Sequence, residues 1–102
     1  MQVKAWKGGP SGFGIRIGKE DVRKHFRPEW ESVRVFIDEE QFEFPLRATF
    51  RTTCPELRGV GIREYLRANN MLPWPKGSPP TLFLTQISGR DFRLSITRDE
   101  VL

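Results

Sequence analysis

Residues 14–28 read GIRIGKEDVRKHFRP, and this stretch changes from the pattern of a strand to that of a helix. Ile15 and Ile17 alternate with a glycine and an arginine, which is typical of a half-buried strand. Beyond them the acidic residues come first and the basic residues last, an order that suits the dipole of a helix. Val22 and Phe26 are spaced i, i+4, so both would face the core from one side of that helix. The stretch therefore predicts a strand that leads into a short helix.

Strand patterns outnumber helix patterns along the rest of the chain. Alternating apolar residues predict strands at 3–6, 13–17, 32–38, 41–50 (broken or bulged at Pro45), 81–86 and 92–97. Helices are predicted at 19–26 and 62–69. The 102 residues contain no internal repeat and no linker, which predicts a single domain over 1–102. Because two short helices cannot cover a sheet, the sheet must largely cover itself. The expected fold is mostly β (α+β), a barrel or half-open barrel with a helix near each end.

Basic residues predominate, but they are unevenly spread. The chain has 17 Lys and Arg against 13 Asp and Glu, a net charge of +4. Residues 1–37 carry eight basic and four acidic side chains and residues 47–102 carry nine and five, so each segment has +4, whereas residues 38–46 have −4. The acidic residues between the basic segments are Asp38, Glu39, Glu40 and Glu43. A positive balance favours an anionic partner such as nucleic acid, although charge alone does not identify one.

Cysteine content and hydropathy bear on the cellular location. Cys54 is the only cysteine, so no disulfide can form within the chain, and a reducing compartment is expected. The first residues lack the apolar run of a signal peptide. No stretch approaches the roughly 20 apolar residues of a membrane-spanning helix. The sequence predicts a soluble, cytoplasmic protein, or a nuclear one in a eukaryote, with no membrane partner.

The stretch 14–28 resembles the DNA-binding pseudobarrel domains, which occur in plant transcription factors of the B-three type and in the recognition domains of some restriction endonucleases. In that family a strand ending Ile-Pro-Lys leads into a short helix that ends near Lys-His-Phe-Pro. The matching residues here are Ile17, Lys19, Lys24, His25, Phe26 and Pro28. The chain departs from the pattern at Gly18, which replaces the proline, and at Arg27, which is inserted before Pro28. After the second helix, residues 76–79 replace the usual Gly-Asp.

The resemblance implies an open barrel of about seven strands that grips the major groove of duplex DNA with two arms, as in transcription regulation, without catalysis of its own. The first arm is the loop and strand before the first helix, and the second is the connection before the second helix. The residues that the resemblance assigns to them are Lys4, Lys7, Arg16 and Lys19 in the first arm, and Arg47, Arg51, Thr52, Thr53 and Arg58 in the second. Arg suits bidentate contacts with guanine, and Thr suits phosphates or base edges. The glycine-rich run 8–12 would let the backbone approach phosphates closely.

No combination of side chains in the sequence predicts an enzyme. His25 has no second histidine to share a metal, and Cys54 has no histidine nearby in sequence to act as its base. The acidic residues at 38–43 fit no calcium loop and are expected to form a solvated hairpin tip. The run 8–12 lacks the Gly-Lys-Ser/Thr of a P-loop. We therefore expect no cofactor, no bound metal and no small-molecule substrate.

Three other functions stay open beside duplex binding. A protein-interaction module of the same fold that has lost DNA binding would account for the missing Gly-Asp and the short first arm. A barrel that binds RNA or single strands would stack bases on exposed aromatic residues, with Trp6, Trp30 and Trp74 as candidates, although such residues more often pack in or around the core. An enzyme is the last alternative.

Overall fold

Seven strands and two helices make up the protein in the computed structural model, which describes residues 1–8 and 12–97. The strands are β1 (Gln2–Gly8), β2 (Gly12–Arg16), β3 (Ser32–Ile37), β4 (Glu40–Pro45), β5 (Glu56–Arg58), β6 (Thr81–Ser88) and β7 (Asp91–Ser95), and the helices are α1 (Lys19–His25) and α2 (Val60–Ala68). α1 follows β2, and α2 follows β5. The prediction of a mostly β fold with two short helices is confirmed.

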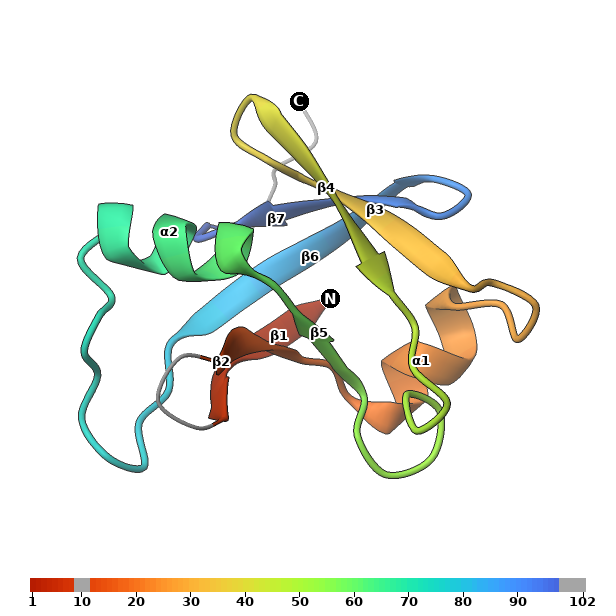
Figure 1. The fold of residues 1–102 in the computed structure, drawn as a ribbon, viewed down its shortest axis with the longest axis horizontal. Helices are drawn as coiled ribbons and strands as arrows, with labels where there is room; N and C mark the ends of the chain where they lie inside the picture. The colour runs from red at the N-terminus through yellow and green to blue at the C-terminus, as the bar shows by residue number, and fades with distance from the viewer. Residues whose placement is uncertain (9–11, 98–102) are drawn as a thin grey trace.

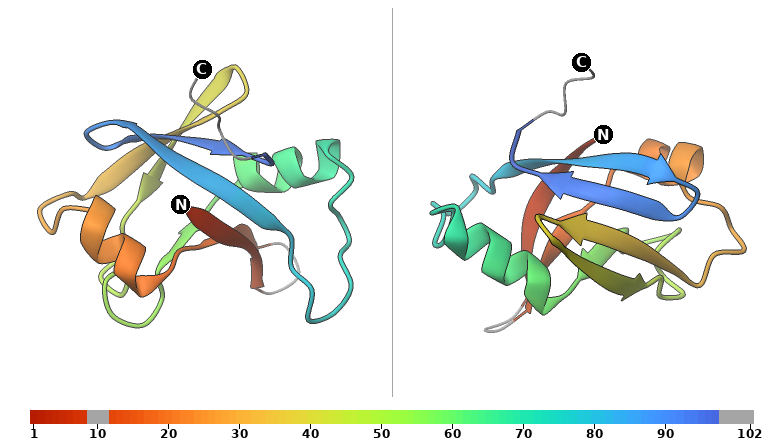
Figure 2. Two further views of the ribbon diagram at one scale, coloured as in Figure 1. Left: turned by 180° about the vertical axis from the view of Figure 1, so that it is seen from behind. Right: turned by 90° about the horizontal axis from the view of Figure 1, so that it is seen from above.

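All seven strands belong to one mixed sheet, in the order β4-β3-β7-β6-β1-β2-β5 (Figure 1). β3 and β7 run parallel, and the other neighbouring pairs run antiparallel. The edge strands β4 and β5 are not paired with each other, so the sheet is open. Figures 1 and 2 show α1 and α2 on opposite sides of the molecule.

The alternation in the sequence buries one side of the sheet in a single hydrophobic core. Val3 and Ala5 of β1 are buried, whereas Lys4 between them is exposed. The same alternation buries residues of four other strands: Ile15, Val33, Val35, Ile37, Leu82, Leu84, Phe92 and Leu94. The helices add Val22, Ile62, Tyr65 and Leu66. The residues predicted to face the core from the 14–28 stretch, Ile15, Ile17, Val22 and Phe26, are all buried.

Four aromatic side chains fasten α1 and the 46–55 connection to the sheet. Phe26 stacks on Phe92 of β7 with ring centroids 4.9 Å apart, and Phe50 of the connection lies 5.1 Å from Phe26. Trp30 packs edge-on against Phe26 at 6.2 Å and Phe92 at 6.4 Å. Aromatic pairs at these separations stabilise a fold beyond the area that they bury. We call these four residues the aromatic cluster; it anchors α1, which follows the first predicted arm, and the connection that forms the second.

The predicted interruption of the 41–50 strand at Pro45 is confirmed, but its continuation over 46–50 is wrong. β4 ends at Pro45, which has no N–H to continue the hydrogen-bond ladder. The chain then turns, and the Phe50 N–H donates to the carbonyl of Arg47 at 2.9 Å. Phe50 is buried all the same. Its burial comes from the turn and the aromatic cluster, not from alternation along a strand.

β5 is a strand that the residue pattern did not predict. Its three residues lie in the polar stretch that was expected to be a connection. It pairs antiparallel with β2, with Arg58 opposite Gly14 and Glu56 opposite Arg16. β1 is also longer than predicted, because it continues to Gly8. With β5 the sheet has seven strands, the number that the resemblance implies.

The helices and the last hairpin match their predicted positions to within one or two residues. The turn between β6 and β7 contains Gly89 at a φ of +53°, a left-handed conformation that glycine adopts without steric cost. The Tyr65 hydroxyl accepts a hydrogen bond from the Ile96 N–H at 3.0 Å, which ties α2 to the end of β7. Within residues 1–8 and 12–97, no helix has the length and apolarity needed to cross a bilayer.

Candidate nucleic-acid interface

Five of the nine residues predicted to contact DNA lie together beside the start of α1. A hollow of about 440 Å³ is lined by Lys4, Arg16, Lys19 and Thr53, among others. A second hollow of about 310 Å³ is lined by Lys19 and Arg51, so Lys19 joins the two. All five side chains are exposed. We call these residues, Lys4, Arg16, Lys19, Arg51 and Thr53, the basic face.

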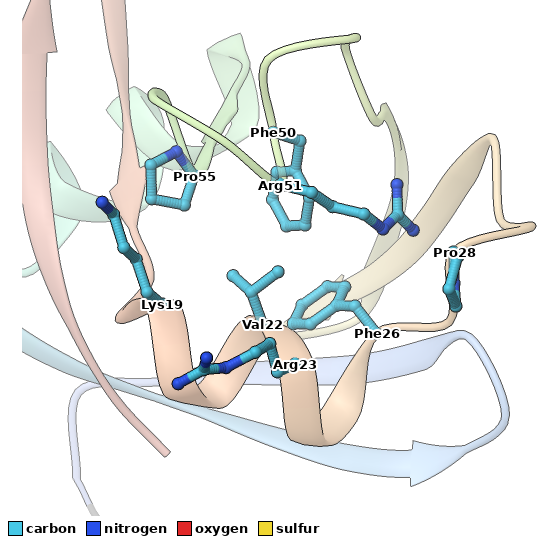
Figure 3. A pocket seen from close by; sticks show the side chains of 8 residues that line it. All are labelled: Lys19, Val22, Arg23, Phe26, Pro28, Phe50, Arg51 and Pro55. Carbon is cyan, nitrogen blue, oxygen red and sulfur yellow. The ribbon is translucent and has the colours of Figure 1, made fainter.

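The second hollow lies between α1 and the 46–55 connection (Figure 3). Lys19 and Arg23 reach it from α1, Arg51 reaches it from the connection, and the ring of Phe26 lies between them. Arg23 was not among the predicted residues. It follows Lys19 by four positions and so lies on the same face of the helix, a spacing that could have identified it.

The pairing of β2 with β5 brings the two segments together. Arg16 lies opposite Glu56 in this pair, and the Ile17 N–H donates to the carbonyl of Pro55 at 2.8 Å, one step beyond the ladder. The end of the connection is therefore fixed beside the end of β2, where α1 begins. Segments about 35 residues apart in the sequence form one surface because a three-residue strand joins them.

A buried carboxylate holds two of the predicted arginines. The Glu56 side chain is 2% exposed, whereas Arg16 and Arg58 are 55% and 38% exposed. Arg16 Nε donates to Glu56 Oε2 at 3.1 Å, its Nη2 donates to the same oxygen, and Arg58 Nη2 donates to Oε1 at 3.0 Å. A guanidinium has five N–H donors. Each arginine is thus held by Glu56 and still has donors directed elsewhere.

The two arginines also set the protonation of Glu56. Burial alone would raise the pKa of this carboxyl, but the hydrogen bonds and positive charges of Arg16 and Arg58 outweigh that effect and hold its pKa below the ordinary value of 4.5. A carboxyl whose pKa is lower in the folded than in the unfolded protein stabilises the fold above its unfolded pKa. That contribution is lost as the pH falls through the folded pKa.

Glu56→Gln is expected to lower the free energy of unfolding at pH 7 by about 1–2 kcal/mol, because a neutral amide binds two guanidinium groups less strongly. It should also flatten the loss of stability that wild type shows below about pH 4.5. Urea denaturation at several pH values measures both effects. Glu39→Gln, at the exposed β3–β4 turn, is the matched control and should behave as wild type. If Glu56→Gln lost stability below about pH 4.5 as steeply as wild type, the lowered pKa of Glu56 would be contradicted.

Arg58 also stacks on Trp6. The Arg58 guanidinium carbon lies 4.3 Å from the centre of the Trp6 ring, within the range of a cation–π interaction. Trp6 lies on β1 and Arg58 on β5, and Gly14 of β2 is paired with both. The two side chains can meet because Gly14 has no side chain between them. The indole of Trp6 thus helps to orient a predicted DNA-contacting arginine.

Gly14→Ala is expected to destabilise the protein by about 1–3 kcal/mol, as overpacking typically does. A Cβ at this position would lie 2.2 Å from the carbonyl oxygen of Leu57, so β5 would have to move away from β2. Thermal unfolding measures the loss. At Gly18 the nearest atom to an added Cβ is 3.8 Å away, so Gly18→Ala serves as the control and should cost less than about 1 kcal/mol. Equal costs for the two variants would refute a close β2–β5 contact.

The other predicted residues are dispersed. Arg58 is connected to the basic face through Glu56, whereas Arg47 is exposed near the start of the connection. Thr52 donates its hydroxyl to the carbonyl of Thr49 at 3.3 Å, a bond within the turn. Lys7 lines a separate hollow with Phe13. In the glycine-rich run predicted to approach phosphates, residues 9–11 lie outside the described part of the chain.

The candidate residues for metal binding or catalysis do not form a cluster. His25 Nε2 lies 4.0 Å from Asp21 Oδ1, one helical turn away, and Cys54 is half-buried. In the part of the chain that the structure describes, no group of three or more His, Cys, Asp or Glu side chains could hold a metal ion. Of the candidate tryptophans for base stacking, Trp30 belongs to the aromatic cluster, and Trp74 packs against Phe13.

The chain was compared with known proteins at three levels. Neither the models of protein families, nor the curated proteins, nor the solved structures contain a significant match to it.

Proposed function

We propose that this domain binds double-stranded DNA through the basic face. The observation that carries the proposal is the meeting of two basic segments, the end of β2 with the start of α1 and the 46–55 connection, on one hollowed surface. The acidic β3–β4 turn lies on the opposite side of the molecule (Figure 1), so its charges do not oppose a bound polyanion there. A concave surface of one sign concentrates the field that attracts the other.

The open sheet supports the finer assignment to a pseudobarrel. Its edge strands β4 and β5 do not pair with each other, and α1 and α2 lie on opposite sides of the molecule (Figures 1 and 2). We infer that the β1–β2 hairpin and the 46–55 connection are the two arms of the pseudobarrel resemblance. Both lie on the side away from the β3–β4 turn, as two arms that enter one groove must.

The chemistry of the side chains suggests a division of roles. Lys4, Lys19 and Arg51 are exposed cations, and none of them pairs with a carboxylate in the described residues. We assign them to phosphates, which carry affinity without sequence information. Arg16 and Arg58 are held by Glu56 with free N–H groups, and we assign them to base edges. A bidentate arginine–guanine pair discriminates by about 1–3 kcal/mol against the wrong base.

The test is fluorescence anisotropy of a labelled random-sequence duplex across a salt series. If Lys4, Lys19 and Arg51 neutralise three phosphates, log K should fall with log salt at a slope of about −3. Arg93 is exposed on β7, three strands from β2. Arg93→Ala therefore removes one positive charge outside the basic face, and this variant should bind as wild type. Absence of duplex binding at low salt would overturn the proposal and favour the protein-interaction module.

A further inference from the structure

A separate hollow of about 380 Å³ lies where the β1–β2 hairpin, α2 and the 71–80 connection meet. Phe13, Leu72 and Trp74 supply much of its apolar lining, and Lys7, Arg63 and Arg67 supply three cations. Its volume is within the range of small-ligand sites, which are apolar cavities with a few placed polar groups. We call it the Phe13 pocket. It shares no lining residue with the two hollows of the basic face.

Two aromatic rings line this pocket. Phe13 and Trp74 meet edge to face, with ring centroids 6.2 Å apart and planes at 84°. Both are only partly buried where they pack against the core. An aromatic pair that keeps part of its surface accessible in a hollow offers a flat ligand a place to stack.

The cations of the pocket are poorly neutralised. Lys7 Nζ and Arg63 Cζ each lie 5.8 Å from the centre of the Phe13 ring. Arg67 pairs with Glu64, whereas neither Lys7 nor Arg63 forms an ion pair with any carboxylate in the described residues. Three cations against one carboxylate leave two uncompensated positive charges around the rings.

This combination matches a nucleobase that carries a phosphate. A terminal phosphate has between one and two negative charges at pH 7 and several acceptor oxygens, which fits two unpaired cations better than a single carboxylate would. Any of the bases can stack on an accessible aromatic ring, because every base has a flat π-face. We propose that the Phe13 pocket binds one nucleotide, with its base against Trp74 and Phe13 and its phosphate between Lys7 and Arg63.

The nucleotide has two possible sources, a free mononucleotide or an unpaired nucleotide in a strand, and both present the same chemistry.

The Phe13 pocket is a second site, separate from the proposed duplex interface. Lys4 lies on the outer side of β1, whereas Lys7 follows Val3 and Ala5 in the alternation and lies on the other side. The two sites therefore use opposite sides of one hairpin, and binding at either can be lost without the other.

The test measures binding of AMP by calorimetry and of a labelled single-stranded oligothymidylate by anisotropy, with the full chain at low salt. Wild type should bind at least one of them. Arg63→Ala and Trp74→Ala should each weaken that binding about 5- to 100-fold, the range expected for loss of a stacked base or its charged partner. Arg63 is exposed on α2, so its variant should fold even if the Trp74 variant does not. Arg93→Ala is the charge-matched control and should leave binding unchanged.

The outcomes separate the two proposals. Binding of AMP identifies a pocket for free nucleotides, and binding of the oligonucleotide alone identifies a pocket for unpaired strand. Nucleotide binding without duplex binding would retain the Phe13 pocket and overturn the proposed function. Duplex binding without nucleotide binding would retain the proposed function and overturn the Phe13 pocket. The pocket proposal fails if neither probe binds, or if Arg63→Ala weakens binding no more than Arg93→Ala.

Discussion

Simultaneous replacement of Lys4, Lys19 and Arg51 by alanine is expected to weaken duplex binding roughly 100-fold at low salt. Each phosphate contact is worth about 1 kcal/mol, and each 1.4 kcal/mol is a factor of ten in affinity. The slope of log K against log salt should become shallower by about three, because three fewer counterions are released. The loss should be similar for all duplex sequences, since phosphates carry no sequence information. Anisotropy titrations of several duplexes across a salt series measure all three effects.

The matched control for this triple variant replaces Lys76, Arg90 and Arg93, three exposed cations outside the basic face. Both variants lower the net charge from +4 to +1, so they differ only in where the charges are lost. Equal weakening by the two variants would mean that overall charge, and not the basic face, binds DNA. Arg16 is left in place because its removal would deprive the buried Glu56 carboxylate of a partner and confuse binding with stability.

The local pattern of the sequence was sufficient for the elements that depend on near neighbours. Alternation identified β1, β2 and β3, and the spacing of Val22 and Phe26 identified α1 with its buried face. β5 could not be found in this way. Three residues between Pro55 and Gly59 are too few to show an alternation, and the strand exists because it pairs with β2, some 40 positions earlier.

The same limit applies to the candidate interface. The sequence supplied the basic residues of both segments, but which of them share a surface depends on the β2–β5 pair. That pair brings Arg16 to Glu56, whereas the alternation along β1 places Lys7 on the side of the strand opposite Lys4. In the sequence Glu56 is one acidic residue in a basic stretch. Its role as the carboxylate that holds two arginines becomes evident only when its burial is known.

Phe92→Ala is expected to destabilise the protein by about 3–5 kcal/mol, more than either Glu56→Gln or Gly14→Ala. Phe92 is fully buried on β7, and its ring stacks on Phe26 and meets the edge of Trp30. Its loss leaves a cavity under α1 that a neighbouring backbone cannot fill without moving. For a chain of this size, each 1 kcal/mol shifts the melting temperature by about 4–8 °C, so a fall of roughly 12–40 °C is expected.

Urea unfolding followed by tryptophan fluorescence measures this loss directly, because Trp30 is part of the aromatic cluster. Phe36→Ala removes the same atoms from a half-buried position on β3 and should cost less than half as much. Phe92→Leu keeps most of the volume and should recover most of the stability. The aromatic cluster also holds Phe50, and with it the connection that carries Arg51 and Thr53. A Phe92→Ala protein that is still folded should therefore bind duplex DNA less well than wild type, and unaltered stability in this variant would contradict the anchoring role of the cluster.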